Sequence, residues 1–289
     1  MCIRDRDTVS DIKGSRLQLV VGYKPELVKS SLDTNKKTNF VLQKKQLGTG
    51  HAVKQALKNL RSNSISLVLY GDGPLIKKQT LIKLIASAEK GNLSILTYKP
   101  SDPHGYGRIV RGKKGLVEKI VEQKDASSGE RKISEVNSGI LAIKTKYLKD
   151  LVIKISNKNA AKEYYLTDIV ELANQAGIPV KATIISDHKQ VRGVNNQQEL
   201  HDLERQYQED LAKQLIAKGA RLADLSRIDV RGHLSVGSGS FIDINAVFEG
   251  NNKMGKNVTI GPNCYISNSI LADDVKVLAN TVIEDSIVG

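Results

Sequence analysis

Hydrophobic and polar residues divide the first two thirds of the chain into short apolar runs and longer amphipathic stretches. The apolar runs have the length and β-branched content of strands, and the stretches between them have apolar residues at helical spacing. Strands that alternate with helices predict an α/β domain with a largely parallel sheet and a ligand crevice at the carboxyl ends of its strands. The predicted strands cover residues 17–21, 40–42, 65–70, 93–98, 107–110, 117–121, 139–143 and 180–185, and the predicted helices cover 25–32, 51–60, the stretch around 81–85, and 167–176.

One apolar run leads directly to a candidate site. Residues 65–70 are almost continuously apolar, which is typical of a central strand covered on both faces. Asp72 follows this strand, so its carboxylate is expected in the crevice, where it can hold Mg²⁺ and bridge to substrate phosphates. An Asp-Gly turn without a ligand explains the same residues equally well.

A second candidate is the Gly48-Thr49-Gly50 turn before a predicted helix. Its glycines let the backbone approach a base or a phosphate closely, and the Thr49 hydroxyl adds a donor. Because such turns are common before helices, the signal is weak by itself. The neighbouring His51 is interpreted as a helix-start residue, since the five histidines show no paired spacing of a zinc site.

A long amphipathic helix is interpreted as the connector between two domains. Asn196 with Glu199 has the pattern of a capping box, and Gly219 is expected to stop the helix. The predicted organisation is a first domain over residues 7–195, the connector over 196–225 and a second domain over 226–289. The apolar stripe of the connector comprises Leu200, Leu203, Tyr207, Leu211 and Leu215.

After the connector the apolar period changes to six. One inward side chain per short strand predicts a left-handed parallel β-helix of hexapeptide repeats from about residue 227. A β-sandwich is the alternative, but its strands would carry an apolar residue at every second position, and this segment does not. The repeat comprises Val230, Val236, Ile242, Phe248, Met254, Ile260 and Ile266, then, after a five-residue step, Leu271, Val277 and Ile283. Those expected to be buried include Val236, Ile242, Phe248, Ile260 and Ile266.

Composition narrows the class of protein. The 289 residues are long enough for two domains, with 40% apolar residues, 4% aromatic residues and no Trp. The net charge is +13, but the lysines are scattered and not interleaved with aromatic residues, which favours a solvated basic surface, or attraction of small phosphorylated substrates, over nucleic-acid binding. Cys2 and Cys264 form neither a disulfide framework nor a metal-ligand spacing, and Cys264 is expected to be buried. No apolar run is long enough to span a bilayer and no secretory leader is present, so we expect a soluble, cytoplasmic protein.

Ordered motifs extend along nearly the whole chain after about Thr8. They are Gln43 with Gln46–Ala52, Leu69–Asp72, Gly105–Ile109, Ile120–Asp125, Glu135–Ile140, Glu163–Asp168 and Gly193–Asn196, followed by the six-residue repeats. In this order they resemble one bacterial family, the bifunctional N-acetylglucosamine-1-phosphate uridylyltransferases/glucosamine-1-phosphate acetyltransferases. The resemblance implies a Rossmann-like nucleotidyltransferase domain, a connector helix and the start of a left-handed β-helix.

The resemblance also implies a reaction. A phosphate oxygen of N-acetylglucosamine-1-phosphate attacks the α-phosphorus of UTP, which gives UDP-N-acetylglucosamine and pyrophosphate, and the cofactor is Mg²⁺. Positioning and charge neutralisation would be the work of the protein. Full-length relatives are expected to be homotrimers that supply cell-wall precursors. The implied residue roles are uracil contact for Gln43, Gly48 and Thr49, lining of the same pocket for Tyr70 and Gly71, sugar contact for Gly107, Glu122 and Asn137, and Mg²⁺ binding for Asp72 and Asn195.

The chain departs from the family pattern in three places. Relatives open with a strand and a Gly-rich loop, bearing Arg and then Lys, that grips the triphosphate, and this sequence begins after both. It stops at Gly289, before the coils that carry the acetyl-coenzyme A site. Gly73 stands where relatives usually have an apolar residue. We therefore interpret the sequence as an internal fragment and expect it to be inactive as a uridylyltransferase by itself.

Three other functions remain open at this point. A sugar-1-phosphate nucleotidyltransferase that acts on glucose-1-phosphate would share most motifs, although the Glu163–Asp168 segment and the context of Asn137 favour N-acetylglucosamine. A non-catalytic scaffold would use the coils only to assemble subunits and would bind no nucleotide. A nucleic-acid binder is the last alternative, and its binding would have to survive physiological salt.

Overall fold

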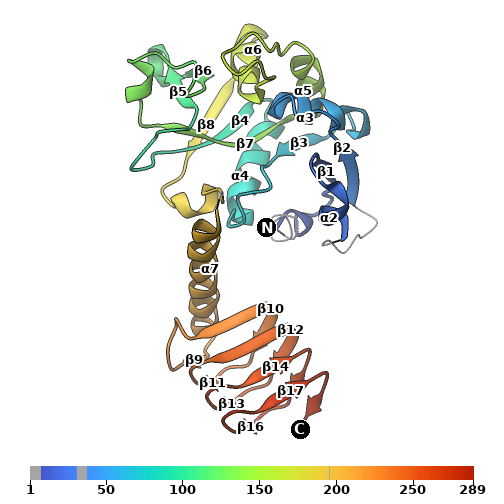
Figure 1. The fold of residues 1–289 in the computed structure, drawn as a ribbon, viewed down its shortest axis with the longest axis vertical. Helices are drawn as coiled ribbons and strands as arrows, with labels where there is room; N and C mark the ends of the chain where they lie inside the picture. The colour runs from blue at the N-terminus through green and yellow to red at the C-terminus, as the bar shows by residue number, and fades with distance from the viewer. Residues whose placement is uncertain (1–7, 31–37, 195) are drawn as a thin grey trace. The chain divides into compact units, whose positions relative to one another are not determined.

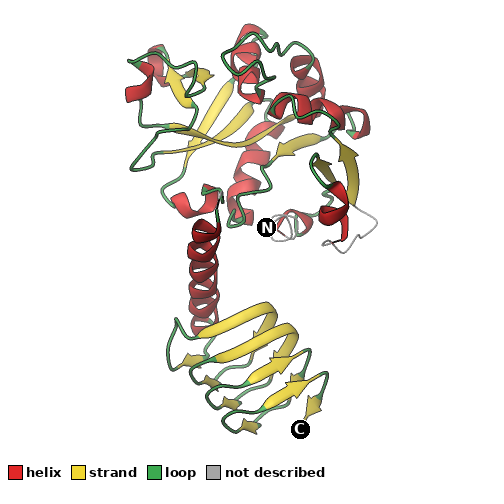
Figure 2. Cartoon of the chain, viewed as in Figure 1, coloured by secondary structure: helices red, strands yellow, loops and turns green. Residues whose placement is uncertain are grey.

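The computed structural model describes residues 8–30, 38–194 and 196–289. The chain divides into two compact units, with the boundary between Gly193 and Val194 (Figure 1). The first unit mixes helices and strands, and the second has one long helix followed by strands alone (Figure 2). No helix of the described segments is both long and apolar enough to cross a membrane. The predicted fold class, an α/β domain followed by a connector helix and a β-helix, is confirmed.

The larger sheet of the first unit has six strands. Five are ordered β6-β5-β7-β4-β8, and β3 also pairs with β7. The pairing of β4 with β8 is parallel, whereas β7 pairs antiparallel with β3, β4 and β5, and β5 pairs antiparallel with β6. The prediction of a largely parallel sheet is therefore wrong for this sheet. The strands are β3 (Ile65–Val68), β4 (Leu93–Tyr98), β5 (Arg108–Arg111), β6 (Val117–Val121), β7 (Val136–Lys144) and β8 (Val180–Ile184).

Helices cover both faces of this sheet. Successive strand residues point to opposite sides, so neighbouring residues of one strand pack against different helices. Ile95 of β4 lies in one apolar cluster with Leu148 of α5, and the next residue, Leu96, lies in another cluster with Leu84 of α4. The helices are α2 (Pro25–Ser30), α3 (Thr49–Ala56), α4 (Lys78–Glu89), α5 (Thr145–Val152) and α6 (Ile169–Gln175).

Two predictions about individual strands of the first unit are also wrong. β1 (Leu17–Val21) and β2 (Thr38–Leu42) form a separate parallel pair instead of joining the larger sheet. β3 was predicted to be a central strand covered on both faces, but among the described strands it pairs with β7 alone, and only Ser66 of its four residues is buried. An apolar run indicates surface that can be covered, but it does not encode which strands pair along each edge.

The second unit begins with α7 (Gln197–Ala217). The Asn196 side chain accepts a hydrogen bond from the Glu199 backbone at 2.9 Å, so Asn196 caps the helix as predicted. Gly219 follows the helix with φ of 95°, a left-handed conformation that glycine adopts without strain. The stop predicted at this glycine is therefore confirmed.

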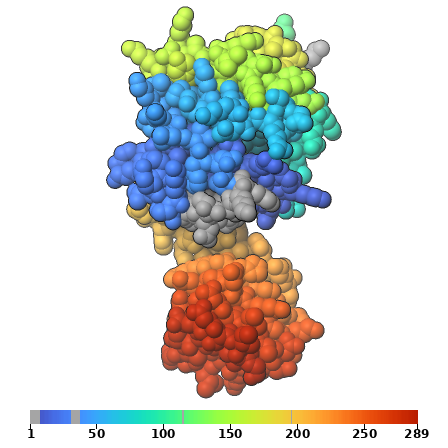
Figure 3. Space-filling view, turned by 90° about the vertical axis from the view of Figure 1, so that its right-hand side faces the viewer, coloured from blue at the N-terminus to red at the C-terminus, as the bar shows by residue number. Residues whose placement is uncertain are grey.

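The strands after α7 stack in parallel as the coils of a β-helix. β10 (Ile228–Val236) pairs with β12 (Ala246–Met254), and the later coils continue the same in-register stacking. Successive coils form the orange to red surface of this unit in Figure 3. The stack starts earlier than the repeat predicted, because β9 (Arg221–Leu222) already pairs with β11 (Phe241–Ile242). The remaining strands are β13 (Thr259–Ile260), β14 (Tyr265–Ser267), β15 (Ile270–Leu271), β16 (Lys276–Val277), β17 (Val282–Glu284) and β18 (Ile287–Val288).

The six-residue repeat forms the interior of the stack. Ile242, Phe248, Ile260 and Ile266 are buried as predicted, whereas Val236 is only partly buried. The thiol of Cys264 is buried in the same cluster, as expected, and Cys2 lies outside the described residues.

The five-residue step of the repeat shortens one corner of the coil. Phe248 pairs with Ile266, 18 positions later, but Met254 pairs with Leu271, 17 positions later. The corner between β14 and β15 is at Asn268, which has φ of 45°. It is one residue shorter than the equivalent corner of the preceding coil, around Gly250. The alignment of the inward side chains is preserved on both sides of this corner.

A ladder of asparagine side chains follows another corner of the stack. Asn245 donates to Asn263 at 2.8 Å, and Asn263 donates to Asn280 at 3.2 Å. All three residues have φ near +60°. Asparagine tolerates this left-handed conformation better than most residues, and its side-chain amide bonds to the next coil.

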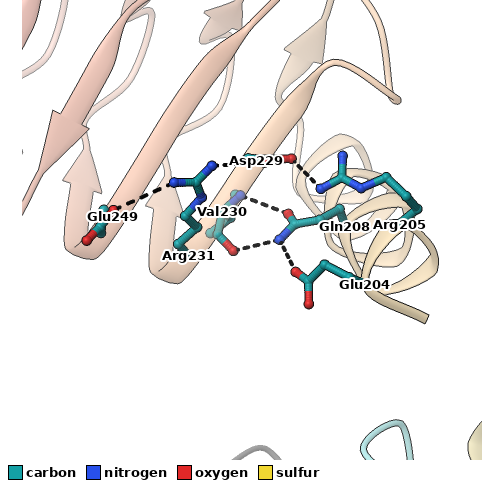
Figure 4. Close-up of polar contacts among 7 residues, drawn as sticks. All are labelled: Glu204, Arg205, Gln208, Asp229, Val230, Arg231 and Glu249. Atoms are coloured by element: carbon teal, nitrogen blue, oxygen red, sulfur yellow. Dashed lines mark hydrogen bonds and ion pairs between the residues drawn. The ribbon is translucent and has the colours of Figure 1, made fainter. Parts of the chain in front are cut away.

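Helix α7 closes the first edge of the stack through one side chain. The amide of Gln208 accepts from the Val230 backbone N–H at 2.8 Å and donates to the Val230 carbonyl at 3.0 Å (Figure 4). Its Nε2 also donates to Glu204. Gln208 is buried, so its amide takes the place that the backbone of a further strand would have beside β10.

Candidate functional site

The Gly48-Thr49-Gly50 turn is packed against the backbone of residues 164–166. The Gly50 N–H donates to the Tyr164 carbonyl at 2.8 Å, and the Leu166 N–H donates to the Thr49 hydroxyl at 3.0 Å. A Cβ at Gly48 would lie 2.7 Å from the Tyr164 carbonyl oxygen, and one at Gly50 would lie 2.9 Å from it. Close approach between two backbone segments therefore explains why both positions are glycine.

Gln43 is held against this turn. It is buried, and its Nε2 lies 3.2 Å from the Gly48 carbonyl oxygen and 3.0 Å from Nδ1 of His51. The other ring nitrogen of His51 contacts Gln55 at 3.1 Å. His51 lies in the first turn of α3, as predicted, and its ring is used by two glutamine side chains.

Tyr70 joins the turn to a small pocket. Its ring lies over Gly139, where a Cβ would overlap the ring, and Gly139 has φ of 80°. Burial raises the pKa of Tyr70 to about 12, a hydrogen bond from the Thr49 hydroxyl lowers it, and the charges of Glu122 and Asp72 raise it further. The phenol therefore stays protonated at neutral pH and remains a hydrogen-bond donor. The pocket is lined by Tyr70, Ile95, Ile120, Asn137, Gly139, Leu141, Leu166, Thr167, Ile169 and Val170.

Three predicted sugar contacts lie together beside this pocket. The Asn137 N–H donates to the Gly107 carbonyl at 2.9 Å, and a Cβ on Gly107 would lie 3.3 Å from the Glu122 carboxylate. Burial raises the pKa of Glu122, and a hydrogen bond from the Thr167 hydroxyl at 2.9 Å opposes that shift. The pocket is thus edged by an amide, a carboxylate and the open backbone of a glycine.

An ion pair between the buried Glu135 and the exposed Arg111 lies just before the strand that carries Asn137. Glu135 accepts from two nitrogens of Arg111 at 2.7 Å each and from the Thr97 hydroxyl at 2.7 Å. Burial alone would raise the pKa of Glu135, but the hydrogen bonds from Arg111 and Thr97 outweigh it and lower the pKa. Glu135 lies two residues before Asn137 and directly before the first residue of β7, Val136.

The predicted metal ligands can be compared only in part. Asp72 is partly buried, and a Cβ on Gly193 would lie 3.2 Å from its carboxylate oxygen, so the segment just before Asn195 passes beside Asp72. Asn195 itself lies outside the described residues. The described residues contain no group of three or more His, Cys, Asp or Glu that could hold a metal. Mg²⁺ in nucleotide sites needs only one or two protein carboxylates beside phosphates and water, so a single carboxylate fits it.

The structure brings most of the predicted residues into one connected cluster. It runs from Gln43 through the 48–50 turn to Tyr70, and from Tyr70 across the pocket to Asn137. Gly107 and Glu122 complete it on the far side of Asn137.

Sequence reasoning did not single out two residues of this pocket. Gly139 provides the surface under Tyr70, and Thr167 orients Glu122. Both stand inside quoted motifs, but only the fold indicates their position.

Comparison with known proteins identifies the family of the chain. The sequence profile described as nucleotidyl transferase matches residues 14–190. The chain is 47% identical over 283 residues to "Bifunctional protein GlmU" of Marinobacter nauticus, an alignment that covers 98% of this chain and 62% of that protein. It is 45% identical over 273 residues to "Bifunctional protein GlmU" of Pseudomonas putida, covering 94% and 60%. The chain spans about 60% of the length of these relatives. It belongs to the nucleotidyl transferase family.

Proposed function

We propose that the first unit is the uridylyltransferase part of an enzyme that joins UTP and N-acetylglucosamine-1-phosphate into UDP-N-acetylglucosamine and pyrophosphate. The observation that carries the proposal is the continuity of the cluster. The polar contacts of Gln43 and Thr49 and the small pocket that Asn137 lines beside Glu122 are joined by one phenol, that of Tyr70. A nucleotide sugar has the same two parts in the same order.

The nucleoside end would be recognised by the backbone around the 48–50 turn. Gln43 is held by Gly48 and His51, so its amide is presented in one orientation. A preoriented amide discriminates between bases because a mismatched edge leaves a buried polar group without a partner. Tyr70, protonated at neutral pH, would keep its ring against the nucleoside side of the pocket.

The sugar end would be recognised by hydrogen bonds to hydroxyls and the acetamido group. Glu122 accepts from Thr167 and has further acceptor capacity, and the Asn137 side chain lines the pocket. A Cβ on Gly107 would lie 3.0 Å from Ile120 and 3.3 Å from the Glu122 carboxylate, so glycine allows this backbone to lie close to Glu122.

Transfer would rest on positioning and charge neutralisation, without a covalent enzyme intermediate. Asp72, with Asn195 as the second proposed ligand, would hold Mg²⁺, which when bound neutralises charge on the phosphates. The phenol of Tyr70 and the carboxylate of Glu122 would hold the two ends of the substrates so that the phosphates meet near Asp72. The proposed assembly is a homotrimer through the β-helix, which sedimentation analysis tests.

Titration of the chain with UDP-N-acetylglucosamine by calorimetry tests the proposal. We expect saturable binding, weaker binding of UDP-glucose because it lacks the acetamido group, and loss of binding in Gln43→Ala. An exposed control, Gln198→Ala in α7, should bind as the unchanged chain does. Equal affinity for the two sugars would favour a glucose-1-phosphate enzyme. A chain that is folded but binds neither would support the scaffold interpretation and overturn the proposal.

A further inference from the structure

Arg108 of β5 is an unusual core residue. Its side chain is 2% exposed and is among the largest fully buried side chains of the protein. Arginine is almost never buried this completely without a carboxylate partner, because a desolvated charge is costly. Within residues 8–30, 38–194 and 196–289, no ion pair to Arg108 is found, and its Nε is buried without a hydrogen-bond partner.

The polar contact that Arg108 does make is to a turn. Its Nη1 donates to the backbone carbonyl of Tyr106, two residues earlier. That carbonyl belongs to the turn of residues 103–107, which ends at Gly107 beside the pocket. Through this hydrogen bond the guanidinium holds the turn whose last residue, Gly107, borders Glu122 and Asn137.

Apart from the Gly107 carbonyl, which accepts from the Asn137 N–H, the other polar contacts found for this turn among the described residues are long or exposed. The Tyr106 N–H reaches the Pro103 carbonyl at 3.3 Å, and the Gly105 N–H reaches Gln123 at 3.4 Å in an exposed position. Gly105 has φ of 86°, a left-handed conformation that glycine adopts without strain. The Tyr106 ring packs edge-on against the Tyr98 ring, with 5.7 Å between the ring centroids. This contact holds the Tyr106 side chain but does not involve the Tyr106 backbone carbonyl.

The sheet places Arg108 for this task. Val136 of β7 lies opposite both Tyr98 of β4 and Arg108 of β5, so these three side chains share one face of the sheet. Gly107 and Asn137 occupy the next positions and face the other side, where the pocket lies. A buried side chain on one face of the sheet thus contacts the turn that borders the pocket on the opposite face.

We infer that Arg108 is a positioning residue for the sugar-binding half of the site: its guanidinium fixes the 103–107 turn so that Gly107 meets the sugar. This deepens the proposed function and rests on it. Arg108 touches no substrate in this arrangement. Its effect should therefore appear in binding of the sugar part and not in binding of the uridine part.

Parallel titrations of UDP-N-acetylglucosamine and of UDP separate the two contributions. In Arg108→Met, which keeps an unbranched apolar stem without the donors, we expect about tenfold weaker binding of UDP-N-acetylglucosamine. Binding of UDP should weaken less than about threefold. Arg108→Lys, which keeps one donor and the charge, should recover part of the loss. Arg131→Met removes the same charge from an exposed position and should change neither affinity.

The outcomes distinguish the inference from the proposed function. If the unchanged chain does not bind UDP-N-acetylglucosamine, the proposed function fails. If it binds, but Arg108→Met weakens UDP and UDP-N-acetylglucosamine equally, Arg108 is merely structural and the inference is overturned. Unchanged binding of both ligands overturns it as well. Circular dichroism melts of each variant confirm that the titrations are made on folded protein, and Arg108→Lys carries the comparison if Arg108→Met does not fold.

Discussion

At the scale of single residues, the site depends on glycines that accept neighbouring groups at van der Waals distance. Gly48 and Gly50 lie against a backbone segment, and Gly139 lies under the ring of Tyr70. The first two match a motif that the sequence made conspicuous, although the reason is chain packing as much as ligand approach. The third is a position where a side chain and Tyr70 cannot both be present.

Gly139→Ala is therefore expected to be strongly destabilising. The added methyl group overlaps the Tyr70 ring, and alanine is strained at φ of 80°, so we expect a loss of about 2–4 kcal/mol in the free energy of unfolding. Urea denaturation measures it. Gly129→Ala, at a glycine with φ of −71° and open space around its Cβ position, should change stability by less than about 0.5 kcal/mol. Equal effects of the two substitutions would show that Tyr70 moves aside freely.

Asp168 gives the site a pH dependence. Burial, and then the charge of Glu122, raise its pKa from 3.8 to about 6. A raised pKa means that the protonated form is favoured in the folded state. The associated stability is complete below pH 3.8 and is lost as pH rises through about 6.

Asp168→Asn should therefore be more stable than the unchanged chain at pH 8 and equally stable near pH 4. The full shift would correspond to about 3 kcal/mol, and solvent screening of this half-exposed carboxylate reduces the expected gain to about 1 kcal/mol. Urea midpoints at the two pH values measure the difference. A variant that is less stable than the unchanged chain at pH 8 would contradict the account that burial and the charge of Glu122 disfavour ionised Asp168.

At the scale of elements, α7 closes an edge that would otherwise be open. The first strand of a parallel stack has backbone groups along one side that the next coil cannot reach. The Gln208 amide bonds to both backbone groups of Val230. Around it, Arg205 pairs with Asp229 at 2.8 Å and Arg231 lies between Asp229 and Glu249 (Figure 4). These outer pairs are exposed and contribute little to stability.

Gln208→Leu should destabilise the second unit by about 2–4 kcal/mol, because it leaves the buried N–H and carbonyl of Val230 without partners. The open edge should also promote self-association at high concentration. Denaturation and light scattering measure the two effects. Gln198→Leu removes an exposed amide that bonds to Asp202, and it should cost less than about 0.5 kcal/mol. A similar cost for both would mean that water replaces Gln208 at the edge.

Sequence patterns predicted elements well where one physical signal dominates. The strands over 17–21, 93–98 and 117–121 have the predicted bounds, because each is a short segment with several Val, Ile or Leu residues. Helix α5 was not predicted, since it starts directly after the last residue of β7 and no turn residues separate the two elements. The role of β3 was misjudged because pairing along an edge is a long-range property.

The candidate site was predictable in part. Asp72 and the 48–50 turn stand out by position, whereas the roles of Glu122 and Asn137 came from the family resemblance. Neither pattern nor resemblance could indicate that Arg108 is buried, because charged residues are normally expected at the surface. Convergence of these segments around one pocket is visible only in the fold.

At the scale of the whole molecule, each unit has an apolar core of its own. Ile95 and Leu148 belong to a core of the first unit, and Phe248 and Ile266 belong to that of the second. The second unit also contains the helix that closes its first edge. We therefore expect the second unit to be stable without residues before Val194.

Residues 194–289 expressed alone are expected to fold. The fragment should show strand and helix signals by circular dichroism and a cooperative thermal transition. Gln208→Leu in the same fragment should lower the transition by several degrees, which distinguishes a native cap from a collapsed state. A fragment that exposes apolar surface to a fluorescent dye and melts without a transition would contradict the division into two independent units.

The asparagine ladder has a consequence for how such a protein can change length over evolution. Asn245 and Asn263 are 18 residues apart and occupy equivalent rungs, and each contacts only the rungs above and below it. A duplication of one coil therefore supplies its own rung, its own inward side chains and its own corner, and it disturbs no contact elsewhere. A tandem copy of residues 246–263 should be accepted with an unchanged or higher melting temperature, whereas an insertion of half a coil should not. Genes for such stacks can thus lengthen by whole turns, each of which is ready for selection to modify.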